Sequence, residues 1–377
     1  MKAKLFGAVA FCLLSIDITC SASAETYNFT ALPGLNGWGA TIAYGINDAG
    51  QVVGYSQNSN GINQAVIWKG TTPTAIGPAL SPPAGEFTQA SAINNFGQVV
   101  GNIGTQPTIW NGTIPTSLGT PPGTAYSIPY AINNFGQVVG TSVQTPGSSY
   151  YATIWNGTTP TVLSTPAGYV SNGQGINDAG QVVGNIGNSN QAQAAIWTGT
   201  TLTLLDNLPL GSNALALAIN DAGQVVGLAS DSTGVDEPVI WSGTTPTVLG
   251  TLGYGGFANA INDTGQIVGE AFTPYTGTPY SNVRAVIWDG TTAIDLNTLI
   301  NGGSAGWTLY QAFSINILGQ IVGVGTNPSG LSEAFLLTPA AQTPLPAALP
   351  LFATGLGVLG LFGWRRKRTA SGTLAVI

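Results

Sequence analysis

One nine-residue pattern, I-N-x-x-G-Q-[VI]-V-G, recurs along this chain of 377 residues and constrains the fold more than any other feature. Its seven copies begin at Ile46, Ile93, Ile132, Ile176, Ile219, Ile261 and Ile315. The mean interval of about 45 residues falls in the range that indicates propellers and solenoids. The chain is therefore an array of one structural unit.

A second pattern, close to A-V-I-W-x-G, alternates with the first. Its tryptophans are Trp68, Trp110, Trp155, Trp197, Trp241 and Trp288, and the seventh copy has Leu337 instead. Each repeat thus offers four short apolar runs. The first ends in Ala-Ile-Asn, and the next three read approximately Gln-Val-Val-Gly, Ala-Val-Ile-Trp and Pro-Thr-Val-Leu. These β-branched and aromatic runs predict four strands per repeat, and the absence of a 3.6-residue period argues against helices.

The turn between the first two runs has Asn at its first corner and Gly at its fourth in every copy. This is the preference of a type I hairpin turn, in which Asn bonds to the turn backbone and Gly adopts positive φ. We interpret Asn94 and Gly97 as residues that specify the fold. A role in binding a ligand is the less favoured alternative.

Neighbouring apolar residues such as Val52-Val53 point to opposite faces of a strand, so both faces of each sheet must be buried. Four-stranded sheets that pack face to face around an axis satisfy this requirement. The sequence therefore predicts an all-β fold, a seven-bladed β-propeller of four-stranded repeats. An open β-solenoid is the alternative.

The two ends of the array favour the closed ring. Thr26 to Leu32 has the character of a fourth run, whereas no fourth run follows Ala334 to Leu337. We expect Thr26–Leu32 to pair beside Glu333–Thr338 and so complete the last blade. Closure removes the exposed sheet edges that promote aggregation, and an open solenoid does not require it.

The repeats resemble those of the extracellular HAF-repeat proteins, a family of secreted bacterial proteins of largely unassigned activity. The third run of that family reads approximately H-A-F-L-W, and Glu333-Ala334-Phe335-Leu336-Leu337 is the most similar copy in this chain. None of the repeats has the histidine of the family's name. The resemblance covers about 310 residues and implies export.

Residues 1–24 have the layout of a secretory signal peptide: a basic start, an apolar run from Leu5 to Leu14, and Ala22-Ser23-Ala24 as the cleavage site. A lipoprotein signal ending at Cys20 is less favoured. Because Cys12 and Cys20 are the only cysteines, cleavage by signal peptidase after Ala24 leaves residues 25–340, the predicted propeller domain, without disulfides.

Residues 341–377 differ in composition from the repeats. An apolar run from Ala347 to Trp364 is long enough, at about 27 Å as a helix, to span a membrane. Four cations follow it as a stop-transfer signal, namely Arg365, Arg366, Lys367 and Arg368. The segment therefore predicts transient or permanent insertion into a membrane.

A proline-rich tetrapeptide, Pro344, Leu345, Pro346 and Ala347, precedes this run. The order of the three elements resembles the PEP-CTERM sorting signals that exosortases process, in their V-P-L-P-A variant, with Thr343 in place of the valine. The resemblance implies that the tail is removed at the surface of a Gram-negative bacterium that makes extracellular polysaccharide. A plain membrane anchor is the alternative.

Charge excludes several classes of function. Between Glu25 and Trp364, two basic residues stand against fourteen acidic ones, a net charge of −12, so a nucleic-acid partner is not expected. The chain has no histidine, which excludes the usual triads and zinc sites. The carboxylates, including adjacent Asp236 and Glu237, show no paired spacing. We therefore expect no enzyme and no cofactor, with a glycan-active enzyme as the least favoured reading.

Three further sets of residues could bind a ligand. Aspartate recurs at one turn position, but one carboxylate per repeat is a poor calcium site; these residues are Asp48, Asp178, Asp221 and Asp263. We expect Gln51 and its six equivalents to bond the backbone of a neighbouring blade rather than a sugar. Four aromatic residues outside the pattern could stack on sugars or cap the blades: Trp38, Tyr254, Trp307 and Tyr310.

Two functional hypotheses follow. The first is an exported structural or interaction module of the cell envelope or the extracellular polysaccharide matrix. The alternative is a glycan-binding lectin on the same scaffold. Propellers host many functions, so the fold does not decide between them.

Overall fold

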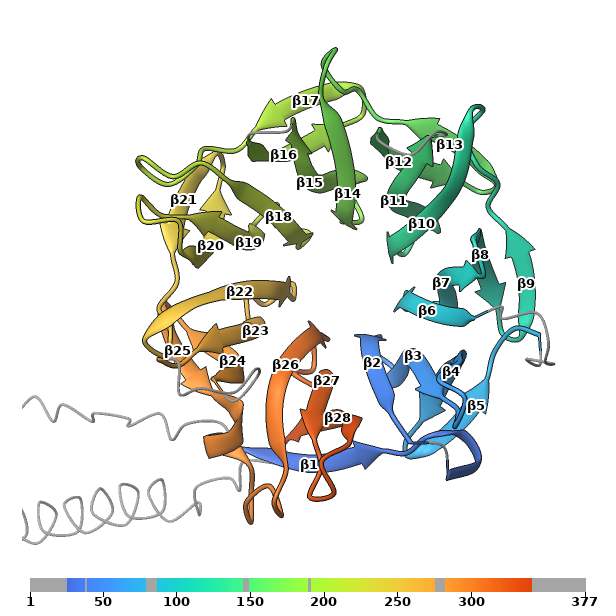
Figure 1. Ribbon diagram of the computed structural model, residues 1–377, viewed down its shortest axis with the longest axis vertical. Coiled ribbons are helices and arrows are strands. Elements are labelled where there is room, and N and C mark those ends of the chain that lie inside the picture. Colours follow the sequence, from blue (N-terminus) through green and yellow to red (C-terminus); the bar gives the residue numbers. More distant parts are fainter. Residues whose placement is uncertain are drawn as a thin grey trace, which may run out of the picture. The chain divides into compact units, whose positions relative to one another are not determined.

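The computed structural model describes residues 26–37, 39–78, 87–144, 149–188, 191–274 and 282–340. These residues form seven four-stranded antiparallel sheets arranged in a ring, a seven-bladed β-propeller (Figure 1). The fold class predicted from the repeats is confirmed. The only helical elements described are two short 3-10 turns, η1 (Leu35–Gly37) and η2 (Leu296–Leu299).

The four runs of each repeat become the four strands of a blade, from the axis outward. The innermost strands are β2 (Thr41–Ile46), β6 (Thr88–Ile93), β10 (Thr124–Ile132), β14 (Val170–Ile176), β18 (Ala214–Ile219), β22 (Tyr254–Ile261) and β26 (Thr308–Ile315). The second strands are β3 (Gln51–Gln57), β7 (Gln98–Ile103), β11 (Gln137–Gln144), β15 (Gln181–Gly187), β19 (Val225–Ser230), β23 (Ile267–Phe272) and β27 (Ile321–Thr326).

The third strands carry the tryptophan motif: β4 (Asn63–Lys69), β8 (Gln106–Asn111), β12 (Tyr150–Asn156), β16 (Ala192–Thr198), β20 (Asp236–Ser242), β24 (Val283–Asp289) and β28 (Ser332–Pro339). The outer strands are β5 (Thr72–Ala75), β9 (Ile114–Ser117), β13 (Thr159–Val162), β17 (Thr201–Leu204), β21 (Thr245–Val248), β25 (Thr292–Asp295) and β1 (Tyr27–Leu32). We number the blades one to seven, starting from β2.

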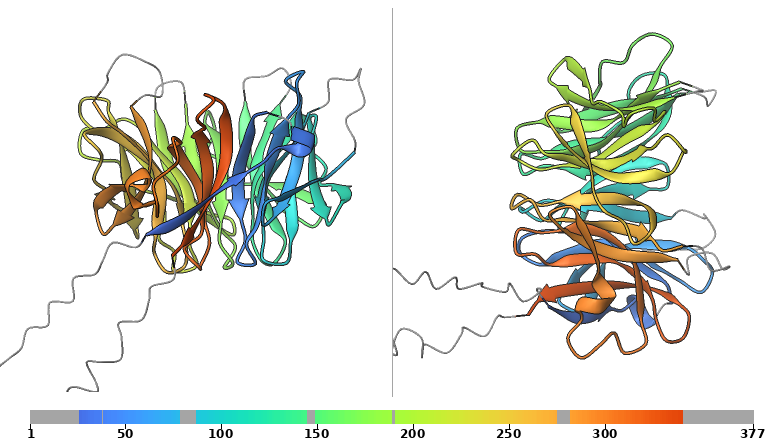
Figure 2. Two further views of the ribbon diagram at one scale, coloured as in Figure 1. Left: turned by 90° about the horizontal axis from the view of Figure 1, so that it is seen from below. Right: turned by 90° about the vertical axis from the view of Figure 1, so that its left-hand side faces the viewer.

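The N-terminal strand closes the ring. β1 pairs antiparallel with β28, with Tyr27 opposite Pro339 and Leu32 opposite Ala334. Figure 2 shows β1 beside the strands of the last blade. Tyr27 and Leu32 are fully buried, so this strand is part of the core. The predicted closure is confirmed, and an open solenoid is excluded.

The hydrophobic core consists of seven clusters, one at each interface between blades. Each motif tryptophan packs against the preceding blade; Trp68, for example, contacts Leu336 and Ala334 of blade seven in one cluster. Its indole N–H donates to the Pro33 carbonyl at 2.9 Å. In the seventh copy, Leu337 is buried with Phe335 and Tyr27 instead. Because a cluster lies at each interface between blades, every sheet buries apolar side chains on both of its faces.

The seven Ile-Asn turns lie on one face of the propeller, which we call the turn face. In each turn the amide of the fourth residue donates to the carbonyl of the first, as Gly97 does to Asn94 at 3.0 Å. The fourth residue has positive φ in all seven copies, +76° at Gly97. The predicted turn is confirmed, including the bond from the Phe96 amide to the Asn94 side chain.

Each turn asparagine also bonds the next blade. The Asn94 side chain accepts from the Gln98 amide at 2.9 Å and donates to the carbonyl of Asn133 at 3.0 Å. The same bond to the next turn recurs from Asn47, Asn133, Asn177, Asn220 and Asn262, and from Asn316 back to Asn47. Seven side chains, all nearly buried, thus form a closed ring of hydrogen bonds around the axis.

We predict that Asn133→Ala lowers the free energy of unfolding by about 2–4 kcal/mol, because it leaves several buried backbone groups without partners. The matched control is Asn60→Ala, at an exposed loop position, where we expect a change within about 0.5 kcal/mol. Equilibrium unfolding by denaturant measures both. Equal effects at the two positions would show that the ring contributes no specific stability.

Candidate functional site

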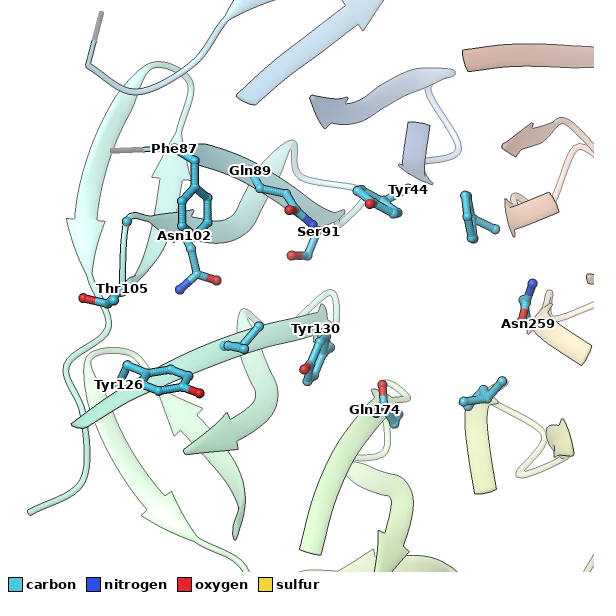
Figure 3. Close-up of a pocket in the computed structure, with 14 residues that line it drawn as sticks. Tyr44, Phe87, Gln89, Ser91, Asn102, Thr105, Tyr126, Tyr130, Gln174 and Asn259 are labelled. Carbon is cyan, nitrogen blue, oxygen red and sulfur yellow. The ribbon is translucent and has the colours of Figure 1, made fainter. Parts of the chain in front are cut away.

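The central channel is lined by one side chain per blade, two residues before each motif isoleucine. These are Tyr44, Ser91, Tyr130, Gln174, Leu217, Asn259 and Phe313. Whereas the neighbouring motif is nearly invariant, this position carries five kinds of polar and aromatic residue and one leucine. Figure 3 shows Tyr44, Tyr130 and Gln174 directed toward the channel.

A β-bulge places each of these side chains. In every blade the pairing of the first two strands shifts at this residue; Ala43 pairs with Gly54 and Gly45 with Val53, so that Tyr44 has no partner. The same shift occurs at the six equivalent positions. A bulge bends its strand and redirects the unpaired side chain, and such bulges often lie beside functional sites.

The last glycine of each motif permits the bulge. A Cβ on Gly54 would collide with the backbone oxygen of Ile42, and equivalent collisions occur in all seven blades. Any side chain would therefore force the inner strand away. The glycine that ends the repeated motif thus supports the one position that varies.

The channel residues form part of a cavity of about 580 Å³, a volume typical of small-molecule sites. From the axis the cavity extends outward between β6 and β10, where Phe87, Gln89 and Tyr126 line it. Its outer end reaches Gly104 and Thr105, the turn between β7 and β8. We call the whole cavity the cleft.

Unequal blades create the outer part of the cleft. The β7–β8 hairpin has a two-residue turn, Gly104-Thr105, whereas the other six hairpins have at least four residues between these strands. The adjoining strand β10 is the longest inner strand, with nine residues. Both the short turn of blade two and Tyr126, near the start of β10, line the outer part of the cavity. Asn102 of blade two joins this part of the cleft to blade three, because its side chain donates to the Ser127 carbonyl at 2.9 Å.

Two tyrosines of the cleft, Tyr44 and Tyr130, are neutral at physiological pH. Burial raises the pKa of Tyr44, and the nearby hydroxyls of Tyr55 and Tyr310 raise it further. Burial also raises the pKa of Tyr130, with a smaller contribution from Tyr126. These phenols therefore remain hydrogen-bond donors and acceptors. Among the described residues that line the cleft, none is charged.

Several polar side chains in the cleft have no hydrogen-bond partner among the described residues. Within the described part of the chain, no hydrogen bond is recorded for the side chains of Gln89, Ser91 or Gln174. Asn259 uses its amide nitrogen in a 3.0 Å bond to the Ala312 carbonyl. The repeated amides are different, because each turn asparagine donates its side-chain N–H to the side-chain oxygen of the glutamine in its own turn. The cleft thus holds free donors and acceptors beside aromatic rings.

The recurrent glutamines belong to the scaffold, but not in the way the sequence suggested. The Gln51 side-chain oxygen accepts from the Asn47 amide of its own turn at 2.9 Å, and all seven repeats share this bond. The expectation that each glutamine bonds a neighbouring blade's backbone was therefore wrong. Asparagine makes that bond, because its shorter side chain lies at the turn corner.

A second cavity, of about 190 Å³, lies on the turn face and is lined by the motif isoleucines, the turn asparagines and the recurrent aspartates. There the Asp48 carboxylate accepts from the Ile317 amide at 3.1 Å, and Asp221 accepts from the Asp178 amide at 2.8 Å. The aspartates thus bind neighbouring blades together. No group of three or more potential metal ligands occurs among the described residues.

The other candidate residues are dispersed. Tyr254 is 56% exposed, Trp307 packs against Phe29 with ring centroids 5.0 Å apart, and Tyr310 bonds the Ser332 hydroxyl. None of them lines the cleft. The signal that identifies the cleft is instead variation at one position of an otherwise constant repeat. Trp38 lies outside the described residues.

The predicted processing and stop-transfer residues also lie outside the described residues. They are Ala22, Ala24, Pro344, Leu345, Pro346, Ala347, Arg365, Arg366, Lys367 and Arg368. Within the described residues, the structure contains no helix with the length and apolar character needed to cross a membrane.

One carboxyl group is buried away from the cleft. Glu270, on β23, is 4% exposed, and its Oε2 has no hydrogen-bond partner among the described residues. Burial raises the pKa of Glu270 to about 7, although a hydrogen bond with Gln311 of the next blade opposes the shift. The folded protein therefore favours the protonated acid.

We predict that the free energy of unfolding falls as pH rises from about 4.5 to 7, by about 3 kcal/mol from this group, and then levels off. The folded pKa lies above the unfolded one, so ionisation favours the unfolded chain. Glu270→Gln should remove this slope. The control, Asp289→Asn at an exposed strand end, should retain it. Denaturant unfolding at pH 5 and pH 8 measures the difference, and a slope that persists in Glu270→Gln contradicts the assignment.

No family model matches the chain, and no curated protein matches it. Among solved structures, a puromycin-hydrolysing peptidase of Mycobacterium tuberculosis aligns at a TM-score of 0.54 and 12% identity; the alignment covers 81% of this chain and 53% of the peptidase. A gluconolactonase of Xanthomonas campestris aligns at a TM-score of 0.42 and 11% identity, covering 84% of this chain and 92% of that one. The chain thus spans about half the length of the peptidase. The first likeness concerns the propeller fold alone.

Proposed function

We propose that the protein is exported, sorted to the cell surface, and acts there as a non-catalytic binding module of the cell envelope or extracellular polysaccharide matrix. The observation that carries this proposal is the cleft. It combines five aromatic side chains with unpaired amides and hydroxyls, which is the composition of a ligand site. A protein with only a structural role has no need for free polar groups there.

The chemistry of the described residues that line the cleft favours binding over catalysis. Acid–base catalysis needs a titratable group near the reacting atoms. Among the described lining residues, the only ionisable side chains are tyrosines, and burial raises the pKa of Tyr44 and Tyr130 still further. Glu270, the acid whose pKa lies near neutrality, does not line the cleft.

The direction of the strands supports presentation from a surface. β1 begins and β28 ends at the turn face, where Tyr27 pairs with Pro339 and Thr338 lies within 3.4 Å of Gln320. Phe87 and Tyr126, which line the outer cleft, lie at the opposite ends of the inner strands. A tether that continues from Pro339 therefore starts on the face away from the cleft opening.

Export and sorting involve the two segments outside the propeller. We propose that signal peptidase cleaves after Ala24 and that an exosortase reads Pro344 to Ala347, the apolar run and the basic cluster Arg365–Arg368. The two prolines hold an extended segment that a processing enzyme can reach.

We predict that protein recovered from the host surface lacks residues 1–24 and the C-terminal cations. In a strain without the exosortase, the tail should remain and anchor the protein in the membrane. Intact-mass spectrometry of both fractions measures this. Ile377 still attached in a host with the exosortase contradicts the sorting proposal and supports a plain anchor.

We predict that the exported protein is retained on cell-free matrix from its producer, and that Tyr130→Ala reduces retention at least fivefold by removing an aromatic wall of the cleft. Tyr254→Ala is the matched control, because Tyr254 is exposed outside the cleft. Co-sedimentation with washed matrix gives the retained fraction. Equal retention of both variants would rule out the cleft as the binding site.

A further inference from the structure

Building on the binding role proposed above, we propose that the ligand of the cleft is a neutral polysaccharide, held through internal residues of its chain. The inference rests on three properties of the cleft: its aromatic surfaces, its unpaired polar groups without charge, and its opening toward the side of the ring.

The aromatic residues supply flat surfaces on either side of the channel. Tyr44 and Phe313 lie together on blades one and seven, with ring centroids 5.3 Å apart and planes at 49°. Tyr130, on blade three, faces the channel from another direction (Figure 3). The C–H groups on the face of a pyranose ring carry a weak positive charge and pack against the negative face of an aromatic ring. Such surfaces match sugar rings in shape and polarity.

The polar groups match hydroxyls rather than charged groups. Carboxamides and hydroxyls, such as Gln174, Gln89 and Ser91, both donate and accept hydrogen bonds, as sugar hydroxyls do. A purely apolar ligand would bury these groups unpaired, which is unfavourable because each group loses its hydrogen bonds to water.

Charge selects against ionic ligands. No cation among the described lining residues could pair with a uronate, sulfate or phosphate, and no carboxylate could pair with an amine. An unpaired charge that enters a partly buried site loses hydration without compensation. The net charge of −12 between Glu25 and Trp364 further repels anionic polymers. A neutral polyhydroxylated ligand satisfies the lining.

The shape of the cleft admits a polymer. The cavity continues from the channel to the short β7–β8 turn, where Thr105 is exposed, and to Phe87, which is 44% exposed. Because these residues at the outer end are exposed, a polymer bound along this path can continue beyond the protein there. The ends of the polymer therefore need no recognition, and several consecutive sugars contact the protein.

The experiment uses the full chain as exported by its host and measures binding by isothermal titration calorimetry. The neutral probes are dextran, galactomannan and mixed-linkage β-glucan, and the acidic probes are alginate and hyaluronan. EDTA is present, so that binding through a metal is excluded. We expect at least one neutral polymer to bind and both acidic polymers to bind at least tenfold more weakly.

Variants locate the site. Tyr130→Ala and Gln174→Ala should each weaken binding of that neutral polymer at least tenfold, whereas the matched exposed controls Tyr254→Ala and Gln191→Ala change it less than twofold. Tyr130→Phe keeps the aromatic surface and should lose less than threefold, which keeps the test valid if Tyr130→Ala misfolds. Thermal unfolding checks each variant.

Oligosaccharides of the bound polymer test whether the cleft recognises internal sugar units of the polymer. Affinity should rise at least tenfold from the disaccharide to the hexasaccharide, and reduction of the hexasaccharide end to an alditol should change it less than twofold. A strong effect of end reduction, or equal affinity for the disaccharide, overturns recognition of internal residues.

The remaining outcomes separate the two proposals. If only acidic polymers bind, the neutral class of ligand is wrong and the proposed function stands. The same holds if no probe binds but the protein is still retained on its producer's matrix through Tyr130. If a neutral polymer binds equally to wild type and to Tyr130→Ala and Gln174→Ala, the cleft is not its site. If neither probes nor producer matrix bind, both proposals fail.

Discussion

The closed ring of asparagine hydrogen bonds is the interaction on which the rest of the structure depends. Each side chain holds its own turn and the carbonyl of the next turn, and the last bond returns from Asn316 to Asn47. A ring of this kind closes only if all blades present the same turn at the same height. The strict repetition of Ile-Asn and Gly-Gln follows from this requirement. The pairing of β1 with β28 separately completes the last blade at its outer edge.

Because amides and buried apolar strands hold the blades together, the chain needs few charges. Charged residues make up 6% of the sequence, against roughly 25% in ordinary soluble domains. The aspartates of the turn face act in the same way as Asn95, through side-chain oxygens that accept backbone amides of neighbouring blades. The repeated polar residues therefore stabilise the scaffold, and the residues available for binding lie where the repeats differ. The bulge residues of the inner strands meet that description, because the motif glycine fixes their place without fixing their identity.

Local chemistry explains how much of the fold could be predicted. An Asn-x-x-Gly turn, four short apolar runs and an unmatched first run are all visible in the sequence, and they correctly predict the positive φ of Gly97, the four-stranded blades and the closure. The partner of Gln51 was predicted wrongly, because two amides four residues apart can bond each other or a neighbour, and sequence spacing alone does not distinguish these geometries. The glycine at the end of the motif went unexplained, since its function depends on a bulge in the neighbouring strand.

The sequence by itself determined the repeat, its strand order, the turn chemistry and the closure, because all of these follow from residues close together in the chain or repeated at fixed intervals. Only the tertiary structure decided the cleft. Tyr44, Tyr130 and Gln174 are separated by more than forty residues, and they meet because ring closure brings equivalent positions to one axis. The side opening likewise depends on a short hairpin in one blade lying beside the longest inner strand of the next. Neither segment alone carries that information, because a cavity is defined by the difference between neighbours in space.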